Sequence, residues 1–400
     1  MSAVDTGLVD AALVERVRMR LAAEPVGQGT ESTASRVASV LRSEGRVLGG
    51  TAMLDVVAAL RSEMSGLGLL QPLLDDPSTT DVLVHGGGEV WVDRGHGLLR
   101  TALRFADDAA VRRLAQRLAA GAGRRLDDAA PFVDARLPGG IRMHAVLAPV
   151  ASSGTCLSLR VAGRTAFTLA ALVDAGSLPS RGADLLQAMV DRRLSTLVTG
   201  AAGTGKTTVL AALLGCVAPT ERIVLVEDSG ELTPDHPHVV HLEARPANLE
   251  GAGAITLRDL LRQALRMRPD RLVVGEVRGG EVLDLLAALN TGHDGGFGTL
   301  HANSAADVPA RLEALALAAG RGREARHSQV AAGVDAVVHL VRDSDGRRRV
   351  AAVGLPRRTP PDGPTVEVEL AVSFAREGIA HPGPAAERLS ALVGSSGCSL

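Results

Sequence analysis

A glycine-rich stretch in the middle of the chain constrains the fold more than any other feature. Residues 200–207, Gly-Ala-Ala-Gly-Thr-Gly-Lys-Thr, have the spacing GxxxxGK[ST]. An apolar, strand-like segment at 194–199 precedes them, and a helical segment begins at residue 206. A strand, a glycine turn and a helix in this order let backbone N–H groups surround phosphate oxygens, while the helix N-terminus adds positive potential. The sequence therefore predicts a phosphate-binding loop; the alternative is a glycine turn that matches by chance.

The lysine of this loop is the only lysine in the chain. The 43 Lys and Arg residues are Lys206 and 42 arginines. Where arginine replaces lysine so thoroughly, the surviving lysine indicates a site that needs a compact ammonium instead of a planar guanidinium. We expect Lys206 to neutralise the β- and γ-phosphates of a nucleotide, and the Thr207 hydroxyl to ligate Mg²⁺. The nucleotide-binding residues predicted from the loop are Gly200, Ala201, Ala202, Gly203, Thr204, Gly205, Lys206, Thr207 and Thr208.

Two apolar segments end in carboxylates. Residues 222–228 end at Glu227 and Asp228, while residues 271–277 carry Glu276. In a parallel sheet the carboxyl ends of the strands face the ligand crevice. An acid there can orient or deprotonate an attacking water, or lie beside Mg²⁺. For Glu227 the alternative is that the carboxylate only caps the next turn, and for Glu276 it is a purely structural role.

Two histidines, eight residues apart, lie in a segment that is rich in glycine. Residues 292–305 contain His293 and His301, and Asn290 and Asn303 flank them. Glycine at this density lets a backbone approach a ligand or a neighbouring subunit closely. We predict that both histidines contact the γ-phosphate or respond to its loss; the alternative is an ordinary core or surface position. No third ligand accompanies them, so a metal pair has no support.

Arginines outside the loop are candidates for stabilising the charge of a transition state. Arg136, Arg142 and Arg160 lie in segments with strand texture, and a helical segment at 256–268 carries four more. For any one of them a solvated or ion-pairing role is the simpler explanation, because the chain has so many arginines.

Composition limits the class of protein. The 400 residues are 46% hydrophobic and 22% charged, which suits two or three folded domains and excludes wholesale disorder. The net charge of −2 gives no chain-wide basic footprint, so we expect no direct nucleic-acid partner. The three cysteines form no CxxC pair and fit a reducing compartment. No run of about 18 apolar residues is present, so any membrane role is expected to be peripheral.

Hydrophobic periodicity divides the chain into four parts. Residues 1–65 are predicted to form a helical N-terminal arm, and residues 72–165, with short alternating strands and one helix, a compact α+β domain. Residues 181–345 alternate helices with apolar strands, which predicts an α/β domain with a mainly parallel sheet. Residues 356–400, rich in Pro and Gly, are expected to be a ragged extension with one added strand at 365–373.

Together these motifs resemble the type II/IV secretion ATPase superfamily, and within it the Tad (tight-adherence, Flp pilus) branch, which also includes conjugal-transfer-associated ATPases of actinobacteria. The resemblance covers about residues 70–345. In the family's terms, 200–207 is the Walker A motif, 222–232 the Asp box, 271–278 the Walker B motif and 292–304 the His box. The resemblance implies a RecA-like P-loop ATPase domain that uses ATP and Mg²⁺. It also implies a hexameric ring in the cytoplasm, bound peripherally to the inner membrane through a platform protein.

The resemblance further implies roles for individual residues. It gives Glu227 the activation of water and places Glu276 beside Mg²⁺ and the γ-phosphate. Arg142 and Arg160 are the best matches for the arginines that the family brings to the nucleotide from the N-terminal domain. The chain departs from the family's pattern at His85, where relatives usually carry Asn, so the details of that turn stay open.

Three functions remain open on the sequence. The first is an ATPase motor for Tad-type pilus assembly or secretion. The second is a retraction or DNA-transfer motor of the same superfamily, against which the near-neutral charge counts. The third is a nucleotide-gated scaffold that binds ATP without hydrolysing it. The presence of Lys206, Thr207, Glu227 and Glu276 together with both histidines argues against the scaffold.

Overall fold

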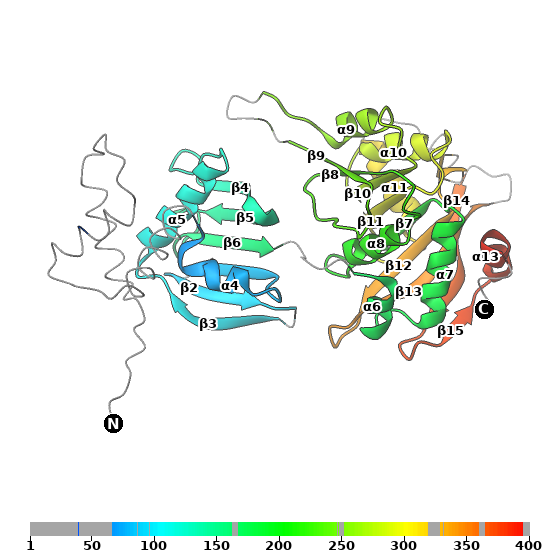
Figure 1. Cartoon of the computed structure of the whole chain (residues 1–400), viewed down its shortest axis with the longest axis horizontal. Helices are drawn as coiled ribbons and strands as arrows, with labels where there is room; N and C mark the ends of the chain where they lie inside the picture. Colours follow the sequence, from blue (N-terminus) through cyan, green and yellow to red (C-terminus); the bar gives the residue numbers. More distant parts are fainter. Residues whose placement is uncertain are drawn as a thin grey trace. The chain divides into compact units, whose positions relative to one another are not determined.

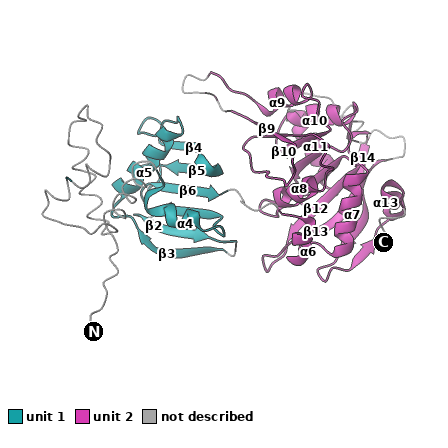
Figure 2. Ribbon diagram, in the orientation of Figure 1, with its two compact units in different colours: residues 1–162 teal, residues 163–400 magenta. Residues whose placement is uncertain are grey.

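Two compact units, residues 1–162 and 163–400, make up the computed structural model (Figures 1 and 2). The structure describes residues 66–85, 87–95, 97–161, 167–245, 252–318, 332–359 and 365–394, together with Ser39, Ala247, Gln329 and Val330. The predicted helical arm at 1–65 lies outside the described residues apart from Ser39.

The first unit contains an antiparallel sheet of six strands, in the order β3-β2-β1-β6-β5-β4. The strands are β1 (Asp81–His85), β2 (Glu89–Asp93), β3 (Leu98–Arg104), β4 (Phe132–Leu137), β5 (Ile141–Val146) and β6 (Cys156–Val161). The helices are α4 (Gln71–Asp75) and α5 (Asp108–Gly121), with single 3-10 turns at Gly68–Leu70 and Pro138–Gly140.

Alternating sequence explains how this sheet acquires a core. In β1, Val82 and Val84 are buried and belong to the same core as residues of α5, while Asp81, Leu83 and His85 are more exposed. Helix α5 begins at a cap, because the Asp107 carboxylate accepts the N–H of Ala110 at 2.7 Å. The short strands and the helix expected within residues 72–165 are present, as β1 to β6 and α5.

The second unit is built on a nine-stranded sheet, in the order β15-β14-β13-β12-β7-β11-β10-β8-β9. The six strands from β12 to β9 are parallel, and β13, β14 and β15 extend the sheet in antiparallel fashion. The strands are β7 (Thr196–Gly200), β8 (Ile223–Glu227), β9 (Val239–Glu243), β10 (Arg271–Val277), β11 (Phe297–His301), β12 (Ala336–Arg342), β13 (Arg348–Thr359), β14 (Thr365–Phe374) and β15 (Ala380–Pro382). The helices are α6 (Leu169–Asp174), α7 (Ser180–Asp191), α8 (Lys206–Gly215), α9 (Leu257–Ala264), α10 (Glu281–Leu289), α11 (Val308–Ala318) and α13 (Ala386–Val393).

Helices cover both faces of this sheet, and each face has its own core. Val198 of β7 packs with residues of α7, α8 and α13, whereas its neighbour Leu197 packs with residues of α9, α10 and α11. A strand that is buried on both faces has a continuous apolar sequence instead of an alternating one. The uninterrupted apolar run of β8 has this cause, since all five of its residues are buried. The α/β fold with a mainly parallel sheet agrees with the prediction.

The C-terminal region corrects one prediction. The sequence suggests a ragged extension over 356–400 with one added strand at 365–373. A strand does lie there, β14, but β13, β15 and α13 also bring residues up to Val393 into the sheet and its core. Val372 and Leu389, for example, are completely buried. Gly378, one of the glycines that suggested irregular chain, has a φ of 82° in the turn between β14 and β15.

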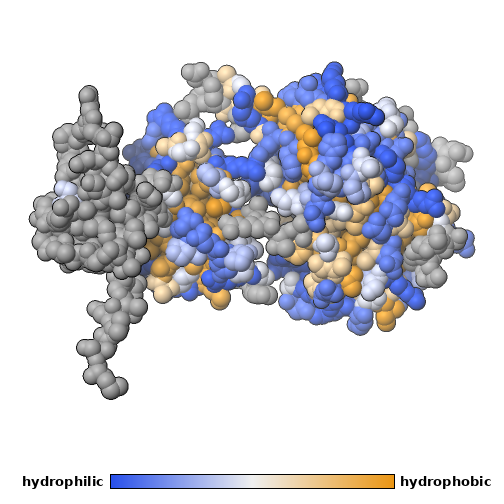
Figure 3. Space-filling model, viewed as in Figure 1, coloured by the Kyte–Doolittle hydropathy of each residue, from blue (hydrophilic) through white to orange (hydrophobic). Residues whose placement is uncertain are grey.

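The surface mixes polar and apolar residues. On the face shown in Figure 3, hydrophobic residues form small groups among hydrophilic ones. Large apolar side chains that stay exposed include Leu99, Phe132 and Ile379. None of the described helices has the length and hydrophobicity that crossing a bilayer requires.

Candidate functional site

The predicted phosphate-binding loop, called the phosphate loop below, joins β7 to α8 at the carboxyl end of the parallel strands. β7 ends at Gly200 and α8 begins at Lys206. Gly200 has a φ of 152°, and a β-carbon there would lie 2.6 Å from the carbonyl oxygen of Leu340. Gly203 (φ 72°) and Gly205 (φ 91°) adopt left-handed conformations that glycine favours. A loop of this shape directs successive N–H groups into a concave anion site.

The remaining residues of the loop differ in how far they are buried. Thr204 is 2% exposed, and its hydroxyl donates to the carbonyl oxygen of Ala201 at 2.9 Å, which closes the turn. Ala201, Ala202 and Gly203 are exposed, so the outer side of the loop is accessible. Thr207 and Thr208 are half-buried in the first turn of α8. The predicted nucleotide-binding residues thus form one continuous turn, as the motif requires.

The Lys206 ammonium lies beneath this loop. The residue is 8% exposed, and Nζ donates to the carbonyl oxygens of Gly200 at 3.2 Å and Ala201 at 2.9 Å. Nζ also lies 3.3 Å from Nδ1 of His301. Burial lowers the pKa of the ammonium, and the negative charge of Glu276 opposes this shift. The only lysine of the chain is therefore a buried cation next to a histidine.

Strand pairing brings His301 and Glu276 to the lysine. β11 lies between β7 and β10, and its register pairs His301 with Gly200. Oε1 of Glu276 lies 2.6 Å from Nε2 of His301, but the ring N–H is not aligned as a hydrogen bond, and the two groups form an ion pair only when His301 is protonated. Oε2 of Glu276 accepts a hydrogen bond from Arg278 at 2.5 Å. We call Lys206, His301, Glu276 and Arg278, in this order, the charged row.

An irregularity in β10 positions Glu276. Val274 pairs with Gly298 on β11, but Val277 pairs with Leu300, so β10 uses one residue more than its partner between these points. A bulge of this kind changes the direction of the side chains that it contains. Glu276 lies within it and turns toward the end of β11.

The contacts of His301 indicate its tautomer. Nδ1 faces the lysine, which can only donate, so Nδ1 acts as the acceptor and Nε2 carries the proton. Burial lowers the pKa of His301, the charge of Lys206 lowers it further, and Glu276 opposes both. Burial alone would raise the pKa of Glu276, but Arg278, His301 and Lys206 together hold it below its usual value. Near neutral pH the charged row therefore combines cations at both ends with a neutral imidazole and a carboxylate.

Glu227 has a different environment at the end of β8. It is 4% exposed, and its Oε1 accepts the N–H groups of Glu231 at 2.9 Å and Leu232 at 3.1 Å. Gly275 on the neighbouring strand makes room for it, because a β-carbon there would lie 2.6 Å from Cγ of Glu227. The carboxylate thus caps the next turn, which was the alternative on the sequence. Its activation of water stays a prediction.

His293 does not reach this site. It precedes β11, whereas His301 ends this strand, so the two histidines belong to opposite edges of the sheet. The strand between them rises by about 13 Å. Nδ1 of His293 is buried and has no hydrogen-bond partner among the described residues. Of the two histidines, only His301 contacts Lys206 in this chain, and a contact of either histidine with a γ-phosphate stays a prediction.

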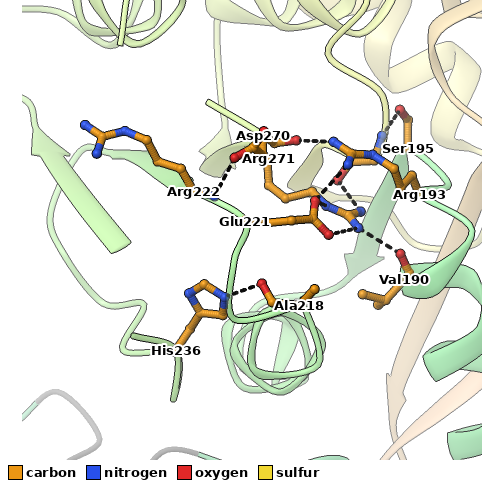
Figure 4. Close-up of polar contacts among 10 residues, drawn as sticks. Val190, Arg193, Ser195, Ala218, Glu221, Arg222, His236, Asp270 and Arg271 are labelled. Atoms are coloured by element: carbon orange, nitrogen blue, oxygen red, sulfur yellow. Dashed lines mark hydrogen bonds and ion pairs between the residues drawn. The ribbon is translucent and has the colours of Figure 1, made fainter. Parts of the chain in front are cut away.

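A buried ion pair occupies that opposite edge (Figure 4). Arg271 is 2% exposed and donates to both carboxylate oxygens of Glu221, at 2.8 and 3.1 Å. It also donates to the carbonyl oxygens of Val190 at 3.0 Å and Gly295 at 3.2 Å. A β-carbon on Gly295 would overlap the Arg271 guanidinium. Glycine at this position thus serves packing, and not the approach of a ligand that its sequence suggested.

The predicted arginines of the first unit lie together. Arg142 on β5 is the register partner of Arg160 on β6 and of Arg136 on β4, so the three form one row across the sheet. Nε of Arg160 lies 3.0 Å from Oδ1 of Asp81, and its side chain is 66% exposed. A role of Arg142 and Arg160 at a nucleotide stays a prediction.

Two candidate residues were missed on the sequence. The first is Arg278. It lies only two positions after Glu276, and its place just beyond an acid at a strand end could have indicated that it contacts this acid.

The second is Arg348. It begins β13 and lines a cavity of about 490 Å³, open mouth included, beside the phosphate loop. The lining includes Thr204, Gly205 and Thr208 from the loop side and Phe167, Leu172, Val209, Leu340 and Val350 from the apolar side. No hydrogen-bond or ion-pair partner of the Arg348 side chain lies among the described residues.

Known proteins are similar to this chain in sequence and in fold. The chain matches the type II/IV secretion system protein family over residues 63–377. A protein of Mycobacterium tuberculosis (strain H37Rv) that carries a conjugal-transfer name is 57% identical over 318 residues, which are 78% of this chain and 90% of that protein. The Bordetella bronchiseptica homologue of the type IV secretion system protein PtlH is 33% identical over 308 residues, which are 70% and 91% of the two chains. The crystal structure of the pilus retraction motor PilT with bound ADP has a TM-score of 0.54 and 21% identity, and covers 74% of this chain and 84% of its own.

Proposed function

We propose that this chain, which belongs to the type II/IV secretion system protein family, is an ATP-hydrolysing motor of a secretion or pilus system. It would convert ATP and water into ADP and phosphate. One observation carries this proposal: the charged row lies directly beside a glycine loop that is shaped to receive phosphates. A scaffold that only binds nucleotide would not need a carboxylate held next to the lysine of the loop.

Positioned positive charge is the main requirement of phosphoryl transfer. We assign the β- and γ-phosphates to the N–H groups of the loop and to Lys206. On binding, Nζ would exchange the carbonyl oxygens of Gly200 and Ala201 for phosphate oxygens, which are stronger acceptors because they are charged. His301 would respond to this exchange, because it contacts both Lys206 and Glu276.

Mg²⁺ fits the donor groups of the site. It prefers oxygen ligands, and in nucleotide sites it takes few of them from the protein. The Thr207 hydroxyl is such a donor, and we propose that it ligates the ion together with the nucleotide, while the Glu276 carboxylate lies beside the ion and the γ-phosphate. The described residues contain no group of three or more His, Cys, Asp or Glu side chains that would bind a metal without ATP. When bound, the ion would neutralise phosphate charge and orient the γ-phosphoryl group.

The cavity beside the loop is our candidate for the base and ribose of the nucleotide. Its walls are mostly apolar, as is common for small-molecule sites. Thr208 and Gly205 connect it to the phosphate loop, and Phe167 and Leu172 provide surface for an aromatic base. The guanidinium of Arg348 can stack on such a base.

Glu276 is the acid that we propose for orienting or deprotonating the attacking water. Its lowered pKa keeps it ionised, as a general base must be. Glu227 also ends a strand at this edge of the sheet, and the family resemblance supports a water-activating role for it. In the present arrangement its Oε1 is engaged by two backbone N–H groups.

We further propose a homohexamer that acts at the cytoplasmic face of the cell membrane through an inner-membrane platform protein. Arg142 and Arg160 would supply additional positive charge at the nucleotide. For the cargo, the motifs favour assembly of a Tad (Flp-type) pilus. The conjugal-transfer name of the M. tuberculosis relative favours a second candidate, a conjugal DNA-transfer motor.

Phosphate release by the purified full-length chain tests the proposal. We expect wild type to hydrolyse ATP in the presence of Mg²⁺, Glu276→Gln to bind ATP but hydrolyse it poorly, and Lys206→Ala to lose binding or turnover while remaining folded. Sedimentation of the same samples, with and without ATP and Mg²⁺, reports the ring. Binding without turnover in the wild type, even in a ring, would favour the scaffold.

Two further observations distinguish the candidate cargoes. Faster ATP hydrolysis in the presence of DNA would favour the DNA-transfer motor, whereas prepilin and platform genes beside the coding gene would favour the pilus motor.

A further inference from the structure

The Glu276 carboxylate accepts one side-chain hydrogen bond in this structure, and Arg278 donates it. Oε1 lies 2.6 Å from His301, and Oε2 accepts from Arg278 at 2.5 Å. A hydrogen bond from a guanidinium stabilises the ionised carboxylate and so makes it a weaker base toward water. If Glu276 is the acid of the proposed function, release of Arg278 before hydrolysis would make it a stronger base.

Arg278 is the partner that is free to leave. Its side chain is 62% exposed, whereas His301 ends a strand of the sheet. The backbone of Arg278 is fixed, because the buried carboxylate of Glu281 accepts the N–H groups of Arg278 and Gly279, both at 2.6 Å. The side chain of Arg278 can therefore change its rotamer while its backbone, and with it β10, stays in place.

The charges around Arg278 show where it can go. Its hydrogen bond to Glu276 raises the pKa of the guanidinium, with smaller contributions from the negative charges of Asp228 and Glu231. In the other direction, the positive charge of Arg278 contributes to lowering the pKa of Lys206, so the two cations lie within electrostatic range of each other. Phosphate oxygens bound at Lys206 would thus attract Arg278 as well.

We propose that Arg278 is a phosphate ligand that exchanges Glu276 for the terminal phosphoryl group of ATP bound in the same subunit. This inference rests on the proposed function. A guanidinium matches phosphate oxygens with paired N–H donors, and hydrogen bonds between charged groups are stronger than neutral ones. The exchange frees Oε2 of Glu276 only when a third phosphate is present. With ADP, Arg278 stays on Glu276, and the acid stays engaged.

The test compares a triphosphate with a diphosphate. Calorimetry of the full-length chain with Mg²⁺ measures the affinity for adenylyl imidodiphosphate, a triphosphate analogue that resists hydrolysis, and for ADP. We expect Arg278→Gln to weaken the triphosphate analogue by about tenfold or more, as loss of a charged hydrogen bond does, and to change ADP affinity by less than about twofold. Arg278→Lys, which keeps the charge but not the fork of donors, should give an intermediate loss. Arg376→Gln, which removes an exposed arginine paired with Asp345, is the matched control and should change neither affinity.

The outcomes separate this inference from the proposed function. Unchanged ADP binding shows that Arg278→Gln is folded. Equal changes for both nucleotides, or no change in either while turnover falls, would overturn the phosphate contact. A loss seen only at concentrations where the chain sediments as an oligomer would overturn contact within one subunit. A wild-type chain that binds neither nucleotide would instead contradict the proposed function itself.

Discussion

Gly275 of β10 faces Glu227 of β8 across the sheet, with room for a hydrogen atom but not for a methyl group. A β-carbon on residue 275 would lie 2.6 Å from Cγ of Glu227 and 3.1 Å from its Oε1. The buried carboxylate can therefore hold the turn at Glu231 and Leu232 only because its neighbour lacks a side chain. Gly275 thus contributes to the site through the space that it leaves for Glu227, and not through a side chain of its own.

Gly275→Ala should destabilise the second unit by about 1–3 kcal/mol, because an added methyl group in a packed core forces its neighbours to shift. Thermal unfolding followed by circular dichroism measures the effect. Gly215→Ala is the matched control in the same unit, since its β-carbon would meet only ordinary contacts, the nearest at 3.6 Å. An unfolding temperature of Gly275→Ala at or above that of the control would contradict this packing argument.

Lys206→Arg should behave like a loss of the side chain, even though it keeps the charge. The ammonium lies in a space that is 8% exposed and contacts two carbonyl oxygens and an imidazole. A planar guanidinium is larger and cannot reproduce these contacts. We expect ATP turnover to fall by about a hundredfold or more, in the range of a lost electrostatic stabiliser. Turnover close to that of wild type would show that positive charge alone suffices.

Glu227→Gln should keep turnover within about threefold of wild type, because an amide oxygen can still accept the two N–H groups that Glu227 now holds. Glu276→Gln, measured beside it, should lose about a hundredfold or more, as expected for a general base. The reverse order would assign the water-activating role to Glu227, as the family resemblance implies. Both variants are close in shape to wild type, so the comparison isolates the charge.

The pH dependence should report His301, whose pKa lies below its usual value of 6.5 because of burial and the charge of Lys206. A histidine with a lowered pKa in the folded state stabilises the fold fully above about 6.5, and this contribution is lost as the pH falls through the lowered value. Protonation also adds a positive charge between Lys206 and Arg278 and removes the acceptor of Lys206. We therefore expect turnover to fall on the acid side below pH 6.5, and His301→Gln to lose this limb. A profile that is the same in both proteins would exclude His301 as its source.

Glu221→Ala should cost about 3–5 kcal/mol of stability, because it leaves the buried guanidinium of Arg271 without its carboxylate. Glu221 also lies 3.0 Å from Arg193, which loses a partner in the same variant. Arg376→Gln, which breaks an exposed pair, should cost less than about 1 kcal/mol. Denaturant unfolding monitors both, and equal costs would contradict the importance of burial.

The sequence predicted what depends on local pattern. The phosphate loop is a contiguous motif, and runs such as 223–226 are apolar throughout because both faces of the strand are buried. The meeting of Lys206, His301 and Glu276 followed from parallel strands whose ends share one edge. The separation of His293 from His301 was not predicted, because it depends on His293 lying before β11 and His301 at its end. The bulge around Glu276 and the contact of Arg278 depend on pairing register and side-chain direction, which no linear pattern encodes.

The solitary lysine has a practical consequence for chemistry at this site. Apart from a terminal α-amino group, Lys206 offers the only primary amine of the chain, and its pKa is lowered by burial. Amine-directed reagents would therefore modify one internal position, and isotope-labelled methyl groups introduced by reductive methylation would give a single internal resonance. Arginine side chains do not react in such an experiment, so the internal resonance would report only on the phosphate loop around Lys206.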